Sequence, residues 1–192
     1  MTALDIATIG EPVLRASART IPIEDIQSPP MQRFIDDLIE TMRAANGAGL
    51  AANQVFRSIR LCAVEVRPNN PRYPYKPAFP LTILVNPRVT ALTDETFDNY
   101  EGCLSVPGLR GVVPRAVGVH VEALDRHGKP TEREVWGLSA GTFQHECDHL
   151  DGRLFIDRVR DTTTLCTWEM FSRYHESDFV TRAKGLIQRF GA

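Results

Sequence analysis

The sequence predicts an α+β fold in which mainly antiparallel strands surround a central helix and further helices lie towards the two ends. Three observations predict this class. The middle of the chain holds segments rich in β-branched residues, helical patterns lie towards both ends, and two of the strands are joined by a hairpin turn. The central helix is the segment that carries a His-Glu-x-x-His pattern at residues 145–149.

The length of the chain favours one domain. With 192 residues, and about 150 residues as a usual domain size, we expect a single domain over residues 1–192, in which 161–192 form a helical C-terminal extension. A hydrophobic fraction of 43%, a charged fraction of 24% and a net charge of -2 describe an ordinary soluble protein without a basic excess. We therefore expect no direct binding of nucleic acid.

The first residues and the cysteines indicate a cytoplasmic protein. The N-terminal segment has no basic stretch followed by an apolar run, and eighteen consecutive apolar residues occur nowhere. We expect neither a signal peptide nor a membrane span. The four cysteines form no Cys-x-x-Cys pair, so we expect no disulfide framework, and buried filler is the default role for Cys62, Cys103, Cys147 and Cys166.

The first long helix is predicted over Met31 to Asn46. Its apolar residues recur at helical spacing and form one stripe, which consists of Met31, Phe34, Ile35, Leu38, Ile39 and Met42. Ser28-Pro29-Pro30 before the helix and Asn46-Gly47 after it are typical start and stop signals. The helix leads into GAGLAANQ, residues 47–54, whose two glycines permit a close approach of the backbone to a ligand.

Strands are predicted at Ile59–Val66, Thr82–Val85 and Gly118–Leu124, which are rich in β-branched residues. The last of them meets DRHGKP, in which Gly128 suits a hairpin turn, and TEREVWG at residues 131–137 returns as its partner. Between the first two strands, residues 68–80 carry a proline at every third position. We favour an extended, stiffened surface loop there, with a polyproline II ligand for a partner as the alternative.

The stretch QHECDHLDG carries the clearest chemistry. On a helix, His145 and His149 lie one turn apart and aim both imidazoles at one metal ion, while Glu146 reaches a water molecule bound there. Cys147 would lie on the core-facing side of that helix. Asp148 is a candidate to orient a histidine, and a solvent-facing aspartate is the equal alternative.

Two histidines cannot hold a catalytic metal alone, and the candidate sites differ in their third ligand. The metzincin pattern needs a third histidine where this chain has Phe155. A downstream glutamate, Glu169 or Glu176, would give a small metallopeptidase, for which little chain remains to build a cleft. We favour Cys103, a glycine-flanked cysteine just before Pro107, which we expect to break a strand. The fourth position then stays open to water, as in catalytic sites.

Taken in order, GAGLAANQ, EGCLSVP at residues 101–107, and QHECDHLDG resemble the three signature motifs of peptide deformylases. IGEPVLR near the N-terminus, VVPR after the second motif and GRLFIDR after the third are also of the kind found in that family. The resemblance therefore covers roughly residues 6–158, and three ordered motifs are more specific than one. It implies that residues 1–192 form one deformylase-like catalytic domain.

This resemblance implies a metal-dependent hydrolase that removes the formyl group from the N-terminal formyl-methionine of newly made polypeptides and releases formate. Cys103, His145 and His149 would bind the metal, and Glu146 would act as base and then as acid. The alternative is a small metallopeptidase of the His-Glu-x-x-His type. A structural metal site would need a fourth protein ligand, for which the spare candidates are Cys62 and His120.

The same resemblance assigns the substrate contacts. The side-chain amide of Gln54 and the backbone N–H of Leu104 would stabilise the oxyanion together with the metal. Gly49 would hydrogen-bond the substrate through its backbone, Arg110 would help to hold the peptide, and an apolar pocket would take the methionine side chain. Glu101 is expected to be structural, with Arg115 as its partner.

The identity of the metal ion is implied by the resemblance to peptide deformylases and not by the types of its ligands. Two imidazoles and a thiolate suit zinc by affinity, whereas the family implies Fe(II) as the working metal, with Zn(II), Ni(II) or Co(II) as occupants in purified protein.

Two helices are predicted within Asp161–Ala192, which we expect to pack as a solvated amphipathic extension. The alternative is a contact with the ribosome through Arg182, Lys184 and Arg189.

Overall fold

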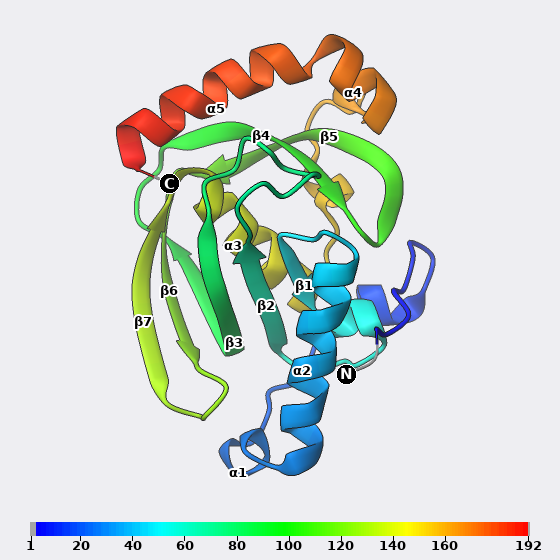
Figure 1. Cartoon of the computed structure of the whole chain (residues 1–192), viewed down its shortest axis with the longest axis vertical. Coiled ribbons are helices and arrows are strands. Elements are labelled where there is room, and N and C mark those ends of the chain that lie inside the picture. The colour runs from blue at the N-terminus through cyan, green and yellow to red at the C-terminus, as the bar shows by residue number, and fades with distance from the viewer. Residues whose placement is uncertain (1–2, 192) are drawn as a thin grey trace.

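A buried helix, α3 (Gly137–Leu150), packs against strands of two antiparallel sheets (Figure 1). The computed structural model describes residues 3–191. In spatial order, the larger sheet consists of β1 (Gly49–Ala51), β2 (Leu61–Val66), β3 (Phe79–Ala91), β6 (Gly118–Leu124) and β7 (Pro130–Trp136). The smaller sheet consists of β4 (Thr96–Cys103), β5 (Val106–Ala116) and β8 (Cys166–Thr167). The predicted α+β class with mainly antiparallel pairing around a central helix is confirmed.

Two groups of helices cover the sheets. Helix α2 (Pro29–Ala44) packs on β1 and β2, whereas α4 (Trp168–Tyr174) and α5 (Glu176–Phe190) lie along the top of Figure 1, above β4 and β5. The short elements are α1 (Ile23–Ile26) and the 3-10 turns at Pro12–Arg15, Ala52–Val55, Phe155–Arg158 and Thr162–Thr164. No helix within residues 3–191 is long and apolar enough to cross a membrane.

Helix α2 matches its sequence prediction closely. The hydroxyl of Ser28 accepts a hydrogen bond from the backbone N–H of Met31, and prolines occupy the first helical positions, where a missing N–H costs nothing. The predicted stripe faces the core, where Phe34, Ile35, Leu38, Ile39 and Met42 are buried and Met31 is half-buried. The helix therefore delivers the glycine-rich segment directly to β1.

The β6–β7 hairpin is confirmed, with Gly128 in the left-handed region at a φ of 77°. Strand β3 is much longer than the four residues predicted. Its first half pairs with β2 and its second half with β6, and the register shifts between Val85 and Arg88. At this bulge the Asn86 side chain accepts a hydrogen bond from the backbone N–H of Ile21 and donates one to its C=O, both at 2.9 Å. The bulge therefore ties the N-terminal segment to the sheet.

The hairpin of β4 and β5 was not predicted, and the expectation that Pro107 breaks a strand is wrong. Pro107 is the second residue of β5, next to the turn where Cys103 faces Val106 and the register shifts. The proline tightens the turn rather than ending the sheet, because a strand tolerates proline near its start. Cys103 thus ends β4 at a kink that turns it towards α3.

The proline-rich loop, residues 67–78 between β2 and β3, lies at the surface as predicted, but the expectation that it is extended is wrong. It folds through successive turns, and its Tyr73 is buried against the ring of Trp168, with ring centroids 6.2 Å apart. Asn70 donates from its side chain to the backbone oxygen of Asn46 at 3.3 Å. The loop is therefore packed against the body of the protein and against α4.

The two helices predicted near the C-terminus are confirmed as α4 and α5, except that residue 192 lies outside the described residues. Phe179 and Ala183 of α5 are buried, and Phe190 stacks on Trp136 with ring centroids 5.5 Å apart. Helix α5 therefore packs on the protein, as the amphipathic pattern predicted.

Candidate metal centre and active site

Three side chains with metal-binding atoms converge in one cluster. Cys103 is the last residue of β4, and His145 and His149 lie one turn apart on α3. The Sγ atom of Cys103 lies 3.2 Å from Nε2 of His149, which lies 3.2 Å from Nε2 of His145. All three atoms lie within 4.8 Å of one another, and the part of the chain that the structure describes holds no second group of this kind.

These atoms suit a metal ion. A tetrahedral ion with bonds of about 2.0–2.3 Å keeps its ligand atoms roughly 3.3–3.8 Å apart. Burial raises the pKa of the Cys103 thiol, but the two histidines lower it by more, so that this pKa lies well below its usual value. The thiolate, which is the form that binds metals, is therefore favoured.

The spare ligand candidates lie elsewhere. Cys62, on β2, is fully buried in the hydrophobic core. His120, on β6, lies with its Nε2 atom 3.0 Å from the carboxylate of Glu132 on β7. Within residues 3–191, the cluster thus offers three protein atoms that could hold a metal ion, and catalytic sites with three protein ligands keep a fourth position for a reacting molecule.

Glu101 and Arg115 hold His145 in place. Nδ1 of His145 lies 2.8 Å from a Glu101 oxygen, and the tautomer favoured by this contact turns the lone pair of Nε2 towards the other ligands. Arg115 donates to both oxygens of Glu101, at 2.7 and 2.9 Å. Burial alone would raise the pKa of Glu101, but Arg115 and His145 lower it far below its ordinary value. The predicted pairing of Glu101 with Arg115 is confirmed, and it orients a histidine.

Asp148 does not face solvent. Within residues 3–191, it also forms no hydrogen bond with a histidine. It is buried and accepts hydrogen bonds from Arg115, at 2.6 Å, and from Arg158. Asp148 therefore acts on His145 only through Arg115 and Glu101.

Glu146 and Gly49 lie against each other. Glu146 is 3% exposed, and its Oε2 atom has no hydrogen-bond partner among the described residues. Burial raises the pKa of this carboxyl above its ordinary value, although the nearby histidines lower it in part. A Cβ atom at Gly49 would lie 2.2 Å from Oε1 of Glu146, so only glycine leaves room for the carboxylate. The close approach that the structure shows at this glycine is to Glu146, and the predicted approach of the backbone to a ligand stays a prediction.

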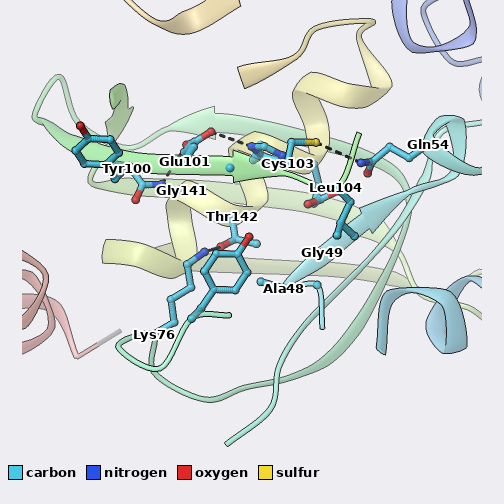
Figure 2. Close-up of a pocket in the computed structure, with 16 residues that line it drawn as sticks. Ala48, Gly49, Gln54, Lys76, Tyr100, Glu101, Cys103, Leu104, Gly141 and Thr142 are labelled. Atoms are coloured by element: carbon cyan, nitrogen blue, oxygen red, sulfur yellow. Dashed lines mark hydrogen bonds and ion pairs between the residues drawn. The ribbon is translucent and has the colours of Figure 1, made fainter. Parts of the chain in front are cut away.

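Gln54 is fixed by bonds at both ends of its amide. Its oxygen accepts from the backbone N–H of Ala51 at 2.9 Å, and its nitrogen lies 3.0 Å from the hydroxyl of Ser105. The same nitrogen lies 3.5 Å from Sγ of Cys103 (Figure 2). The amide nitrogen therefore lies beside Cys103 at the edge of the cluster. Leu104 follows Cys103 and lines the same pocket.

Comparison with known proteins agrees with this arrangement. Residues 3–164 match the model of the polypeptide deformylase family. The chain belongs to the peptide deformylase family. It is 45% identical to peptide deformylase 2 of Nostoc sp. (strain PCC 7120) over 168 residues, which cover 88% of this chain and 92% of the relative. It is 46% identical to peptide deformylase 1 of Bordetella pertussis over 159 residues, which cover 82% and 88% of the two chains.

Two solved structures extend the likeness to the fold. A class I type b peptide deformylase from Acinetobacter baumannii, bound to Met-Ala-Ser, has a TM-score of 0.79 at 39% identity and covers 82% of this chain and 99% of its own. A peptide deformylase from Synechococcus elongatus in complex with actinonin has a TM-score of 0.74 at 28% identity, covering 100% of this chain and 87% of its own.

The deformylase family has a metal-dependent reaction, and this protein removes the formyl group from the N-terminal formyl-methionine of new polypeptides and releases formate. The deformylases matched over most of the chain favour this activity over the alternative of a small metallopeptidase. The glutamates proposed as ligands for that alternative, Glu169 and Glu176, do not join the cluster.

Arg110 does not lie where the deformylase resemblance led us to expect it. Its side chain is 1% exposed and lies between Trp168 and Phe171, with its guanidinium carbon 4.3 and 3.9 Å from the two ring centroids. It donates to the hydroxyl of Tyr75 at 3.0 Å and to the backbone oxygen of Tyr100. Arg110 therefore joins α4 and the proline-rich loop to β4 and does not line the pocket at the metal cluster.

That pocket is also less apolar than the resemblance implied. Besides Gly49, Cys103 and Leu104, its wall contains polar side chains that sequence reasoning did not assign to the site, which are Tyr73, Lys76, Asn99 and Thr142 (Figure 2). Lys76 and Tyr73 come from the proline-rich loop, whose path no local pattern reveals. Thr142 could have been found, because it precedes Glu146 by one helical turn on α3.

Proposed function

We propose that Cys103, His145 and His149 hold the metal of this deformylase, with Fe(II) as the working ion and Zn(II), Ni(II) or Co(II) as occupants in purified protein. The convergence of the three ligand atoms beside a buried Glu146 oxygen without a partner supports this assignment most strongly. When bound, such an ion lowers the pKa of water and polarises the formyl oxygen. Affinity alone would select zinc, so the choice of Fe(II) depends on metal availability and on the family resemblance.

Glu146 acts as the base and then as the acid in this proposal. It takes a proton from the water molecule that attacks the formyl carbon and passes the proton to the departing amine. Burial suits this task, because it raises the pKa of the Glu146 carboxyl towards that of a group that exchanges protons near neutral pH. The contact with Gly49 fixes the position of the carboxylate.

Gln54 and Leu104 stabilise the oxyanion in this scheme. The Gln54 amide is held rigid by Ala51 and Ser105, so that its N–H groups need no reorganisation when negative charge develops. The backbone N–H of Leu104 is the second donor. Gly49 bonds the peptide through its backbone. We do not extend the proposal to Arg110, because aromatic rings enclose it.

We also propose that residues 1–192 work as one catalytic domain in the cytoplasm, with 161–192 as a helical extension and without direct binding of nucleic acid. The net charge of -2 supports the last point. A contact with the ribosome, where new chains emerge, would use Arg182 and Lys184, which are exposed on α5. Arg189 is instead paired with Glu95 at 2.8 Å.

The experiment that tests this proposal measures formate release from a formyl-Met peptide and from the matching acetyl-Met peptide, with protein purified without oxygen. We expect cleavage of the formyl peptide only, because the acetyl methyl group would meet Gln54 and Leu104. Comparable rates on both peptides would contradict the proposed site.

The metal is tested by comparing the Fe, Ni and Zn forms before and after exposure to air. We expect the Fe(II) form to be the most active and to decay in air, because the iron and the adjacent Cys103 thiolate are both open to oxidation. A zinc form as active as the iron form, together with iron activity that survives aeration, would overturn the choice of iron.

A further inference from the structure

The proline-rich loop brings a lysine to the active-site pocket. Nζ of Lys76 lies 2.9 Å from the hydroxyl oxygen of Thr142 and 4.8 Å from the ring centroid of Tyr73. Figure 2 shows the Lys76 side chain pointing towards Thr142 and thus into the pocket that contains Gly49 and Cys103. The wall of the pocket therefore contains a cationic donor.

The loop holds Lys76 firmly in this position. Tyr73 is buried and contacts both Tyr75 and Trp168, with ring centroids 6.5 and 6.2 Å apart. Tyr75 in turn accepts the hydrogen bond from Arg110 and packs edge-on against Phe179 at 5.2 Å. Tyr75, next to Lys76, and Tyr73, three residues before it, are thus tied to the C-terminal helices, so the amine is not a freely moving surface group.

The charge of Lys76 has no carboxylate partner within residues 3–191. Two carboxylates act on its charge from a distance, Glu101 and Glu146, and no ion pair within the described residues joins either of them to Lys76. Glu101 gives its oxygens to Arg115, Asn99 and His145. An ammonium group has three N–H donors, and Thr142 accepts from one. Burial lowers the pKa of Lys76 to about 8, so the amine is mostly protonated at neutral pH. Lys76 can therefore donate to an acceptor on a bound substrate.

The position of Thr142 shows which part of the substrate would meet this donor. Thr142 precedes His145 by three residues, which corresponds to about 4.5 Å along α3. Thr142 and Lys76 line the same pocket as Cys103 and His145, so with the formyl group at the metal cluster this wall would lie beside the side chain of the first residue. A methionine side chain places its sulfur after two methylene groups, and that sulfur is only a weak acceptor. Oxidation to the sulfoxide adds a polar oxygen at the same atom.

We propose that Lys76 allows this enzyme to deformylate peptides whose first residue is formylated methionine sulfoxide, by donating a hydrogen bond to the sulfoxide oxygen. The inference rests on the proposed site. The reaction is the same hydrolysis: the formyl C–N bond breaks, the water oxygen bonds to the formyl carbon, the amine gains a proton, and the sulfoxide leaves unchanged. Polypeptides oxidised at their first residue thereby remain substrates.

The test compares kcat/KM for four tripeptides: formyl-Met-Ala-Ser, formyl-norleucine-Ala-Ser, and the two epimers of the sulfoxide of formyl-Met-Ala-Ser. For the wild-type enzyme we expect the better epimer to be cleaved within about tenfold of formyl-Met. In Lys76→Met, cleavage of that epimer relative to norleucine should fall roughly ten- to a hundredfold, which is the range for a lost hydrogen bond to a charged group. Lys76→Gln keeps a neutral donor and should restore part of the ratio.

The matched control is Lys129→Met, in the exposed turn between β6 and β7, which should leave every ratio as in the wild type. Failure of the wild-type enzyme to cleave either epimer, or an equal loss on all substrates in Lys76→Met, would overturn the role of Lys76. These outcomes are separate from failure of the proposed site, in which formyl-Met-Ala-Ser itself would not be cleaved by the metal-containing wild-type protein.

Discussion

Two arginines of β5, Arg115 and Arg110, are both buried, but their surroundings are opposite. Arg115 pairs with two carboxylates, Glu101 and Asp148, whereas Arg110 lies between aromatic rings and has two nitrogen atoms without a partner among the described residues. An odd separation along a strand places them on opposite faces. One face of the β4–β5 hairpin therefore orients His145, a proposed metal ligand, through fixed charges. The other face holds the C-terminal helices and the loop that shapes the pocket.

This contrast predicts that substitutions on the Arg115 face affect metal binding and catalysis, whereas substitutions on the Arg110 face affect stability and substrate selectivity.

The largest expected effect is that of Cys103→Ala, which should lose both the metal and detectable activity, because two imidazoles alone hold the ion weakly. Metal content and formate release measure it. Cys147→Ala is the control, since Cys147 is buried away from the cluster. Stoichiometric metal in Cys103→Ala would remove the cysteine from the site.

The next effect is that of Glu146→Gln, for which kcat should fall roughly a hundred- to ten-thousand-fold while the metal stays bound. The carboxamide keeps the shape of the side chain but cannot accept a proton. Steady-state kinetics and metal analysis on the same sample check this. A variant with half of the wild-type turnover would show that Glu146 is not the base.

Arg115→Met tests the charged face. Both buried carboxylates would lose their shared cation: Glu101 would keep only Asn99 and His145, and Asp148 only Arg158. Loss of one partner of a buried ion pair costs about 3–5 kcal/mol in the free energy of unfolding. Metal affinity should fall roughly ten- to a hundredfold, because Arg115 no longer fixes Glu101 against His145. Urea unfolding and metal titration measure the two losses. Arg158→Met is the control, since Arg158 is half exposed and contacts only Asp148 among these groups, and it should lose much less.

Arg110→Met tests the aromatic face and should have a smaller effect. Methionine fills similar space between Trp168 and Phe171, and the cation–π contacts that it removes are worth about 1–2 kcal/mol. Metal affinity should match that of the wild type. If Arg110→Met loosened the metal as much as Arg115→Met does, the two faces of the hairpin would not be separate in function.

The smallest effect concerns a third kind of arginine, on the surface. Arg43 pairs with Glu65 at 2.7 Å, and this hydrogen bond, the largest cause, lowers the pKa of Glu65. A lowered folded-state pKa gives stability that is present above the unfolded pKa and lost as the pH falls through the folded pKa. Glu65→Gln should therefore cost about 0.5 kcal/mol at pH 7 and nothing at acid pH. An equal cost at both pH values in urea unfolding would exclude the charge as its cause.

The sequence was most informative where function requires residues to be close along the chain. His145, Glu146 and His149 share one helix, so their spacing alone predicts their common direction. The helix α2 and the β6–β7 hairpin followed from local periodicity in the same way. Cys103 could be proposed because a glycine beside it made a core role poor, although its position depends on the unpredicted turn to Val106.

What could not be predicted depends on contacts between distant segments. Strand β5 contains two prolines and two glycines and lacks a clean alternation, so its pairing with β4 had to be observed. A buried arginine such as Arg110 is improbable until Trp168 and Phe171 are known to enclose it. Trp168 also explains the path of the proline-rich loop, because Tyr73 packs against this ring and Lys76, three residues later, then reaches Thr142.

The packing of Trp168 on the proline-rich loop also gives the protein a temporal order during its own synthesis. A ribosome makes His149 before Trp168 and the loop long before either, so the growing chain contains all three proposed ligands while the loop still lacks its aromatic partner. The proposed ligands and the loop that carries Lys76 are therefore complete before the ring that anchors this loop is added. The last part of the site to be synthesised is the support of its wall rather than any residue of its chemistry.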